Sequence, residues 1–483
     1  MSALPLRVLV LATEVVPLPG LPTNGGGLRG WSLARGLESA GLDVTLLFPR
    51  EPLEALAPEL DPATVAAALS QTFSWADPGA AIREHSPDVV VCCSWFLAAR
   101  LDPCPTPLAV DLAGPILLEF LYQDRAKARE FAASKPRGLA LADFVTCAGE
   151  RQRAYFYPWL MLAGFDQDDL TTRVATVPIS VAPDPAANTD APDNAEPSIL
   201  CAGVVLPWQD PLVPLRATLE TLERRERGTL DLFLYAHPEH SRGARWMGWV
   251  REEAARRPRL RLHPERQRPY AELLAEYRRA DLAFDLFARN PERELAFNTR
   301  TVDYLACGLP PLYNDYAELA GPIARYDAGF VVDPADAAAV SAAVGAALDD
   351  PAGLAARRAN ARRLVDERLT WDRTVAPLAA WCANAARRPR RPDALTVEAL
   401  VPARADAAAA LTAARKASAH WQRLAEEREA YAQQVEAAWQ ERDAALSASA
   451  DALAVHQRAP WRAALRHTFG GSVAWLRGRG GAQ

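Results

Sequence analysis

The chain of 483 residues carries a formal net charge of -6, and half of its residues are hydrophobic. This length exceeds one ordinary hydrophobic core, so more than one domain is expected. The acidic balance excludes a typical nucleic-acid-binding protein, because phosphate binding usually leaves a basic surface over a whole domain. A small or neutral partner fits this composition, and no nucleic acid is expected.

The seven cysteines include no Cys-x-x-Cys pair and no neighbouring histidine, so they are interpreted as reduced core residues. No metal site is expected. The first apolar run, Val8–Thr13, is too short for the core of a signal peptide. No run approaches the length of about 18 apolar residues that a membrane span needs. These features together predict a cytoplasmic protein.

From residue 7 a short apolar run is followed by a Gly/Pro loop, a stretch of helical period over Leu28–Ser39, and a second apolar run. This order is typical of a βαβ unit. Similar apolar runs recur further along, at 89–92, 108–112 and 144–147. Residues 1–181 are therefore predicted to form a doubly wound, Rossmann-like α/β domain.

Residues 182–197 are rich in Pro, Asp and Ala without periodicity, and are predicted to be an interdomain linker. Beyond them the alternation of strands and helices restarts at Ser198–Val204. Residues 198–386 are therefore predicted to form a second Rossmann-like domain.

The C-terminal part has a different composition, in which Ala, Glu, Arg and Gln dominate residues 395–457. Apolar residues at roughly heptad spacing predict a long helix there, and a possible coiled coil that would join two copies or a partner. Residues 458–483 mix aromatic residues with arginines and contain no acid. Such a basic amphipathic tail suits an anionic membrane surface, or would pack on the other domains.

The first candidate site is the turn that contains Gly25, Gly26 and Gly27, between the first strand and the first helix. Glycines let the backbone approach a ligand closely, and the helix start offers N–H groups to an anion or a sugar. Its place at the carboxyl end of a strand favours ligand binding. Because the turn does not match the Gly-x-Gly-x-x-Gly fingerprint, a plain loop is the alternative.

The second candidate site lies within residues 290–310. Asn298 or Thr299 is predicted to start a helix that ends near Cys307, with Gly308 after it. The N–H groups and the positive dipole of its N-terminus, with Arg300 in the first turn, suit a diphosphate.

Three carboxylates accompany this helix. Asp303 lies one turn further in and is suited to a ribose diol, whereas Glu292 and Glu294 precede the helix and are suited to sugar hydroxyls. Without a family comparison, a charged loop before an amphipathic helix is the plainer interpretation.

The run 297–310 resembles the donor-binding element of glycosyltransferase family 4 and related GT-B enzymes, where a Glu-x7-Glu pattern precedes Ala-x-Gly-x-Pro. It is closer to a bacterial subgroup whose motif reads roughly Glu-Thr-Arg-Phe-Ser-Phe-Arg-Thr-Arg-x-x-Asp-Tyr-x-x-Ala-Gly-Leu-Pro. This resemblance gives Glu292 the sugar-binding role and Asp303 the ribose-binding role. Phe297, Thr299 and Arg300 match as well.

Other stretches resemble the same subgroup in order, at 111–119, 142–153, 177–178 and 203–211. Asp111 is expected to face the cleft and contact the sugar or the acceptor, unless it caps a helix. Glu119 is a further candidate cleft residue. The other candidates, each with a surface role as the alternative, are Glu150, Arg151, Arg153 and His237.

The chain also departs from the family pattern. Val205 and Gln209 stand where the broader family has an arginine and a lysine that clamp the diphosphate. Leu295 occupies the place of the first glutamate in a strict Glu-x7-Glu, so Glu294 competes with Glu292 for the sugar. Asn298, a further donor-site candidate, replaces an arginine of the subgroup.

The resemblance implies a GT-B fold, with an acceptor-side domain and a nucleotide-sugar-binding domain facing a cleft. It implies a retaining, metal-independent hexosyl or deoxyhexosyl transfer from a nucleoside-diphosphate sugar, with no separate cofactor. The acceptor would be a hydroxyl of a glycan or lipid-linked molecule in bacterial surface polysaccharide or lipopolysaccharide synthesis, at the inner face of the plasma membrane. Asp111, Glu292 and Arg300 are the catalytic candidates. The alternatives are a sugar-nucleotide epimerase on the same scaffold and a catalytically decayed interaction protein.

Overall fold

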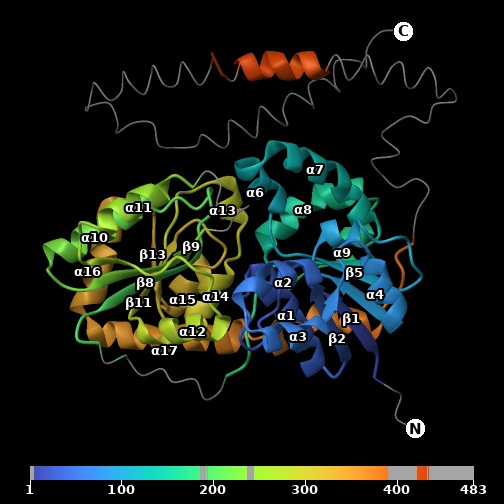
Figure 1. Cartoon of the computed structure of the whole chain (residues 1–483), viewed down its shortest axis with the longest axis horizontal. Helices are drawn as coiled ribbons and strands as arrows, with labels where there is room; N and C mark the ends of the chain where they lie inside the picture. The colour runs from blue at the N-terminus through green and yellow to red at the C-terminus, as the bar shows by residue number, and fades with distance from the viewer. Residues whose placement is uncertain are drawn as a thin grey trace. The chain divides into compact units, whose positions relative to one another are not determined.

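The computed structural model describes residues 5–184, 192, 194–236, 244–389, 421–431 and 433–434. The chain divides into two compact units, residues 1–401 and 402–483. In the second unit residues 421–431 are helical, and Figure 1 draws this helix in orange-red. Apart from residues 433–434, which are also helical, the rest of the predicted helix and the whole basic tail, residues 458–483, lie outside the described residues.

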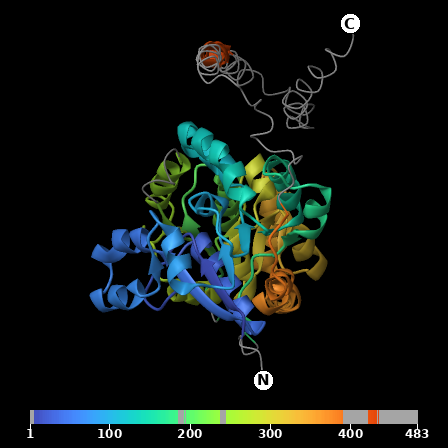
Figure 2. The same ribbon diagram turned by 90° about the vertical axis from the view of Figure 1, so that its right-hand side faces the viewer.

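The first unit contains two parallel sheets, and the first has the strand order β3-β2-β1-β4-β5-β6-β7. Its strands are β1 (Arg7–Leu11), β2 (Asp43–Pro49), β3 (Thr72–Phe73), β4 (Val89–Cys92), β5 (Leu108–Leu112), β6 (Phe144–Cys147) and β7 (Val174–Thr176). The connecting helices are α1 (Gly25–Ser39), α2 (Arg50–Leu56), the 3-10 helix Ala57–Glu59, α3 (Pro62–Leu69), α4 (Pro78–His85), α5 (Trp95–Ala98), α6 (Ile116–Gln123), α7 (Arg125–Ala140), α8 (Glu150–Leu162) and α9 (Gln167–Thr172). Figure 2 turns this half of the molecule toward the viewer.

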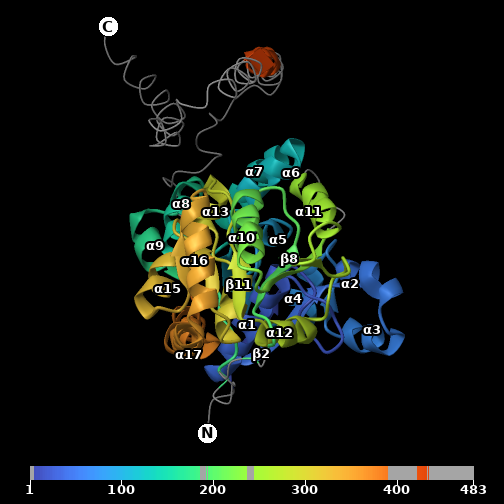
Figure 3. The same ribbon diagram turned by 90° about the vertical axis from the view of Figure 1, so that its left-hand side faces the viewer.

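The second sheet has the order β10-β9-β8-β11-β12-β13. Its strands are β8 (Ser198–Val204), β9 (Thr229–Tyr235), β10 (Leu260–Leu262), β11 (Leu282–Asp285), β12 (Pro311–Asn314) and β13 (Phe330–Val332). Its helices are α10 (Leu212–Arg224), α11 (Trp246–Ala254), α12 (Tyr270–Arg279), α13 (Pro291–Leu295), α14 (Thr299–Ala306), α15 (Ala320–Tyr326), α16 (Ala337–Asp349) and α17 (Pro351–Arg368). Figure 3 shows α10 and α16 side by side on one face of this sheet. These two doubly wound sheets confirm the predicted α/β class.

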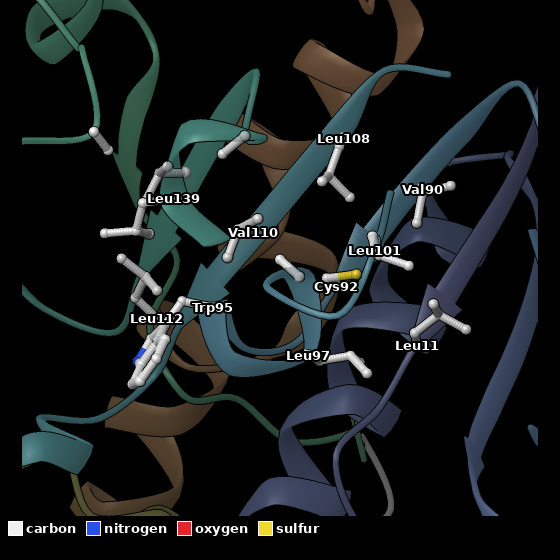
Figure 4. Packing of buried hydrophobic residues seen from close by; sticks show 14 of the residues in the cluster. Leu11, Val90, Cys92, Trp95, Leu97, Leu101, Leu108, Val110, Leu112 and Leu139 are labelled. Carbon is white, nitrogen blue, oxygen red and sulfur yellow. The ribbon is translucent and has the colours of Figure 1, made fainter. Parts of the chain in front are cut away.

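Mostly apolar strands form the centre of each sheet, as expected for parallel sheets covered by helices on both faces. All of β4 and all of β5 are buried. Figure 4 shows the side chains of Val90, Cys92 and Val110 packing beside Trp95 and Leu139 on one face of the first sheet. All seven cysteines are free, and six of them are buried, so most of them lie in the core as predicted.

Helix α1 begins at Gly25, three residues before the predicted start at Leu28. The side chain of Asn24 caps the helix by accepting hydrogen bonds from the backbone N–H groups of Gly26 and Gly27. A Cβ atom at Gly27 would lie 2.0 Å from the carbonyl oxygen of Val15. The glycine run therefore forms the first turn of the helix, where the preceding loop approaches too closely for a side chain.

The chain returns to the first sheet after the second sheet is complete. Helix α18 (Trp371–Thr374) packs against α1, and α19 (Ala376–Ala383) joins the apolar cluster of α1. The ring of Trp381 stacks on that of Phe144 in β6, with centroids 5.1 Å apart. This return ties the two halves of the unit together.

Arg388 fixes the end of this returning segment. Its side chain is 1% exposed, and its guanidinium donates to the carbonyl oxygen of Gly164 at 2.6 Å and to Asp169 at 3.3 Å. Its backbone N–H donates to the carboxylate of Asp143 at 2.7 Å. A buried guanidinium with several acceptors is stable only while all of its partners stay in place.

We expect Arg388→Ala to lower the free energy of unfolding by about 3 kcal/mol or more, because it leaves buried acceptors without a donor. Urea denaturation of the full chain measures this loss. Arg373→Ala, at an exposed position of α18, serves as the control and should change stability by less than about 0.5 kcal/mol. Equal effects of the two changes would contradict the anchoring role of Arg388.

Candidate functional site

The carboxyl ends of both sheets define where a ligand is expected. In the first sheet the strand order reverses between β1 and β4, and in the second sheet between β8 and β11. Open α/β sheets bind ligands outside the carboxyl ends of their strands at such switch points. The glycine turn follows β1, and the segment 290–310 follows β11, so both predicted sites lie at these positions.

Asp285, the last residue of β11, is fully buried and organises this part of the second half. Its carboxylate accepts hydrogen bonds from the hydroxyl of Thr301 and from the side-chain amide of Asn298, the latter at 3.2 Å. It also pairs with the guanidinium of Arg300, whose Nε lies 3.4 Å away. A buried carboxylate needs such donors, so Asp285 fixes the first turn of α14.

A second ion pair extends this network toward the first half of the molecule. Arg293 holds the carboxylate of Glu292 through Nε at 2.5 Å and Nη2 at 2.8 Å. Its remaining nitrogen, Nη1, donates to Asn298 at 2.9 Å. Glu292 is 2% exposed. The predicted sugar-binding glutamate therefore sits in a buried, bidentate ion pair that is linked through Asn298 to Asp285.

Helix α14 confirms the predicted helix, since it starts at Thr299 after Asn298 and is followed by Gly308 in a left-handed conformation with φ of 66°. The side chain of Asn298 bonds to Arg293 and Asp285, so it does not cap the helix. The first turn contains no acidic residue. Among the described residues no side chain caps this helix start, so its N–H groups are left for another acceptor.

The starts of α14 and α1 face one another across the two halves. A Cβ atom at Gly25 would lie 3.3 Å from the hydroxyl oxygen of Thr299. Each helix start carries a positive partial charge, so the two ends together favour an anion between or beside them.

The side chain of Arg300 contacts the end of β8 and the turn that follows it. Its guanidinium donates to the carbonyl oxygen of Ala202 at 2.7 Å and to the side-chain oxygen of Gln209 at 2.8 Å. Gly203 has a φ of 127°, and a Cβ there would lie 3.0 Å from Nη1 of Arg300. A pocket at this turn is lined by Arg300 and Gln209 together with Val204 and other residues. The charge of Arg300 is thus held beside Gln209.

Asp303 is buried one turn further along α14, and the hydroxyl of Tyr270 donates to its carboxylate at 2.7 Å. Burial raises the pKa of Asp303 to about 7, although the hydrogen bond from Tyr270 lowers it. This carboxyl group is therefore close to half-protonated near neutral pH.

The start of α8 receives a carboxylate from the second half. Glu318 accepts hydrogen bonds from the backbone N–H groups of Glu150 at 3.1 Å and Arg151 at 3.4 Å. The next residue, Gln152, donates to the carbonyl oxygen of Leu295 at 2.9 Å. Arg151 also donates to the carbonyl oxygen of Glu294 at 3.3 Å. Arg151 thus contacts the donor-side segment directly.

Three further predicted residues of the first half, Asp111, Glu150 and Arg153, are held in ion pairs. Asp111 is fully buried, and its carboxylate accepts from Arg29 at 2.7 and 2.9 Å and from Thr146 at 2.5 Å. Glu150 and Arg153 pair with each other at 2.5 Å on the surface of α8.

On the donor side, Glu294 pairs with Arg289 at 2.7 Å, and Phe297 packs against an apolar cluster. Glu119 is half-buried on α6. His237 lies outside the described residues.

Sequence reasoning missed Asp285, Arg293 and Glu318. Asp285 ends a buried run, Leu-Ala-Phe-Asp, and a polar residue closing an apolar strand at a carboxyl end is a signal that could have found it. Arg293 and Glu318 gain their importance from tertiary partners, so nothing in the local pattern marks them.

Neither a protein-family model nor a curated protein sequence matches the chain. Solved structures match in fold, among them sucrose-phosphate synthase from Thermosynechococcus elongatus, with a TM-score of 0.56 and 15% identity over 78% of this chain and 98% of that one. A trehalose-6-phosphate protein from E. coli bound with UDP-2-fluoro glucose has a TM-score of 0.55 and 13% identity, covering 79% of this chain and all of that one. WaaG, a glycosyltransferase involved in lipopolysaccharide biosynthesis, has a TM-score of 0.50 and 14% identity, covering 79% and 100%. These likenesses show a two-domain GT-B fold.

Among the described residues no group of three or more His, Cys, Asp or Glu side chains is arranged to hold a metal ion. Within the same residues no helix is both long and apolar enough to cross a membrane.

The pKa of Asp303 leads to a prediction for stability. Because the folded pKa lies above the usual value of 3.8, the folded chain binds more protons than the unfolded chain between about pH 4 and 7. The free energy of unfolding should therefore fall as pH rises through this window, by up to about 4 kcal/mol from this group.

Urea denaturation at several pH values should show a shallower fall for Asp303→Asn than for the wild type. Asp102→Asn, at an exposed position of the first half, is the control and should keep the wild-type slope. Identical slopes for all three proteins would show that Asp303 does not carry the raised pKa.

Proposed function

We propose that this chain is a glycosyltransferase that binds a nucleoside-diphosphate sugar at the start of α14 and transfers the sugar to a hydroxyl group. The observation that carries this proposal is the uncapped start of α14, which faces Gly25 at the carboxyl ends of both sheets. A diphosphate would supply the acceptors that the N–H groups of this helix start require. The GT-B fold and the motif resemblance around Phe297–Pro310 support the same assignment.

In this proposal the donor lies along α14 and α13. The diphosphate binds the N–H groups of Thr299 and its neighbours, the ribose diol binds Asp303, and the sugar hydroxyls approach Glu292. The ion pair with Arg293 orients the carboxylate oxygens of Glu292. Glu294, which pairs with Arg289 in the exposed part of the loop, is the second choice for the sugar.

Arg300 takes over the role of the missing basic clamp. The family resemblance implies a lysine at the place of Gln209, and the guanidinium of Arg300 is bonded to Gln209 itself at 2.8 Å. The positive charge of Arg300 therefore reaches the turn that contains Gln209 from α14, whereas the lysine of the family would lie in that turn itself. This charge and the helix start would stabilise the diphosphate as it leaves, which is the main source of rate in such a transfer.

The remaining features of the reaction follow from the resemblance. We assign a retaining, metal-independent transfer of a hexosyl or deoxyhexosyl group to a glycan or lipid-linked acceptor in surface polysaccharide synthesis. Asp111 acts in this proposal through Arg29, which also donates to the carbonyl oxygens of Val177 and Pro178 and so positions the glycine turn of α1. The location would be cytoplasmic, with residues 458–483 as the candidate membrane contact.

Replacement of Arg300 by alanine should weaken binding of the nucleoside diphosphate by about 10-fold or more, because a hydrogen-bonded charge next to the diphosphate is lost. Thermal shift with UDP-, GDP-, dTDP- and ADP-sugars first identifies the donor, since a bound donor raises the melting temperature. Isothermal titration calorimetry with the matching diphosphate then gives the Kd.

The double change Arg300→Ala with Gln209→Lys should recover part of the affinity, because it returns a cation to the same turn. Arg325→Ala, exposed on α15, is the control and should leave the Kd unchanged. Wild-type affinity in both Arg300→Ala and Asp303→Ala would overturn the proposed donor site.

A further inference from the structure

Glu119 is an acidic residue of the first half that faces the donor side of the molecule. Its helix, α6, contacts α13, and Figure 1 shows the two helices side by side. The electrostatic neighbours of its carboxyl group in α13 are Glu292 and Arg293. A Cβ atom at Gly114 would lie 3.5 Å from Oε1 of Glu119. The carboxyl group therefore folds back over the loop after β5, toward the carboxyl end of the first sheet.

This carboxyl group is crowded but has no partner. No hydrogen bond or ion pair joins Glu119 to any other of the described residues, although the side chain reaches solvent. Burial and the negative charge of Glu292 raise its pKa to about 8, while Arg293 lowers it. Near neutral pH the group is mainly a neutral carboxylic acid, which both donates and accepts a hydrogen bond.

The contrast with Glu292 is informative. Both oxygens of Glu292 are held by Arg293 at 2.5 and 2.8 Å, so the positive charge of that arginine is already balanced. Glu119 lies opposite this pair without a cation of its own. A carboxyl group in that position costs stability, and such costs are often retained at sites that bind a ligand.

Tyr122 stands one turn further along the same helix and is 43% exposed. The centroid of its ring lies 6.3 Å from the centroid of the Trp208 ring in the second half. Burial and the negative charge of Glu292 raise the pKa of its phenol. The buried indole N–H of Trp208 has no hydrogen-bond acceptor in the part of the chain that the structure describes. An exposed aromatic ring beside unpaired polar groups suits the apolar face of a pyranose ring.

We propose that α6 forms the acceptor subsite, where Glu119 hydrogen-bonds a hydroxyl group of a pyranoside acceptor and Tyr122 packs against its ring, opposite Glu292. This inference rests on the proposed function, because it needs a donor sugar beside Glu292. It gives the acceptor a chemical class, a hydroxyl-bearing sugar ring, and it assigns Glu119 the role of an acceptor-binding residue.

The subsite predicts a pH dependence with a definite sign. The titratable and charged groups that face Glu119 are Glu292 and Arg293 from α13 and Tyr155 from α8. Above about pH 8 Glu119 ionises, loses the proton that it donates, and repels Glu292. Acceptor binding should therefore weaken as pH rises through this value, while binding of the nucleoside diphosphate alone at α14 is unaffected.

The test measures release of nucleoside diphosphate from the donor found by thermal shift, with octyl β-glucoside, octyl β-galactoside and octyl α-mannoside as acceptor probes. Glu119→Ala should lower kcat/KM for the acceptor by about 10-fold or more, through a raised KM, and leave the donor Kd unchanged. Glu119→Gln, which keeps a hydrogen-bond donor and acceptor, should retain most of the activity. Wild-type kcat/KM should fall above about pH 8, whereas that of Glu119→Gln should not.

Glu130→Gln, an exposed change on the neighbouring helix α7, is the control and should keep both the activity and the alkaline fall. An acceptor KM that is unchanged in Glu119→Ala, or an alkaline fall that persists in Glu119→Gln, would overturn the subsite. Failure of all three glycosides as acceptors for a chain that binds its donor would overturn the pyranoside class. A wild-type chain that binds no nucleotide sugar would instead refute the proposed function.

Discussion

The buried carboxylate of Asp285 is the constraint on which the candidate donor site depends. A carboxylate that is removed from water must be surrounded by donors, and here these come from the first turn of α14 and the residue before it. Because Asn298 is used in this way, it cannot cap the helix. The same interaction that fixes where α14 begins therefore leaves its N–H groups open to an anion.

The contacts between the two halves follow from similar requirements. The start of α8 needs acceptors for its N–H groups, and Glu318 of the second half supplies them. A Cβ at Gly149 would lie only 2.8 Å from the carboxyl carbon of Glu318, so the close approach depends on a glycine there. Helices α18 and α19 follow the second sheet in the chain and pack against the first half, which gives another contact between the two halves. These contacts bring α6 next to α13 and so place Glu119 opposite the Glu292–Arg293 pair.

The sequence predicts the features that depend on local pattern. Apolar runs predict both parallel sheets, and the order Asn298, Thr299 and Gly308 predicts the bounds of α14. The local pattern does not predict that the side chain of Asn298 leaves the helix uncapped, because that depends on its bonds to Arg293 and Asp285. The partners of Arg300 could not be predicted, since Ala202 and Gln209 lie 98 and 91 residues away. The ion pair of Asp111 with Arg29 and the return of α18 and α19 are equally long-range. His237 and most of residues 395–483 lie outside the described residues, so the roles predicted for them stay predictions.

A crystal structure with the best-binding nucleoside diphosphate tests the central claim most directly. The diphosphate oxygens should lie within hydrogen-bond distance, about 2.7–3.2 Å, of the backbone N–H groups of Thr299 and Arg300. Asn298 should still be bonded to Asp285, with its side chain turned away from the helix start. A diphosphate bound elsewhere, or an Asn298 side chain that caps α14 in the complex, would contradict the dependence of the donor site on Asp285.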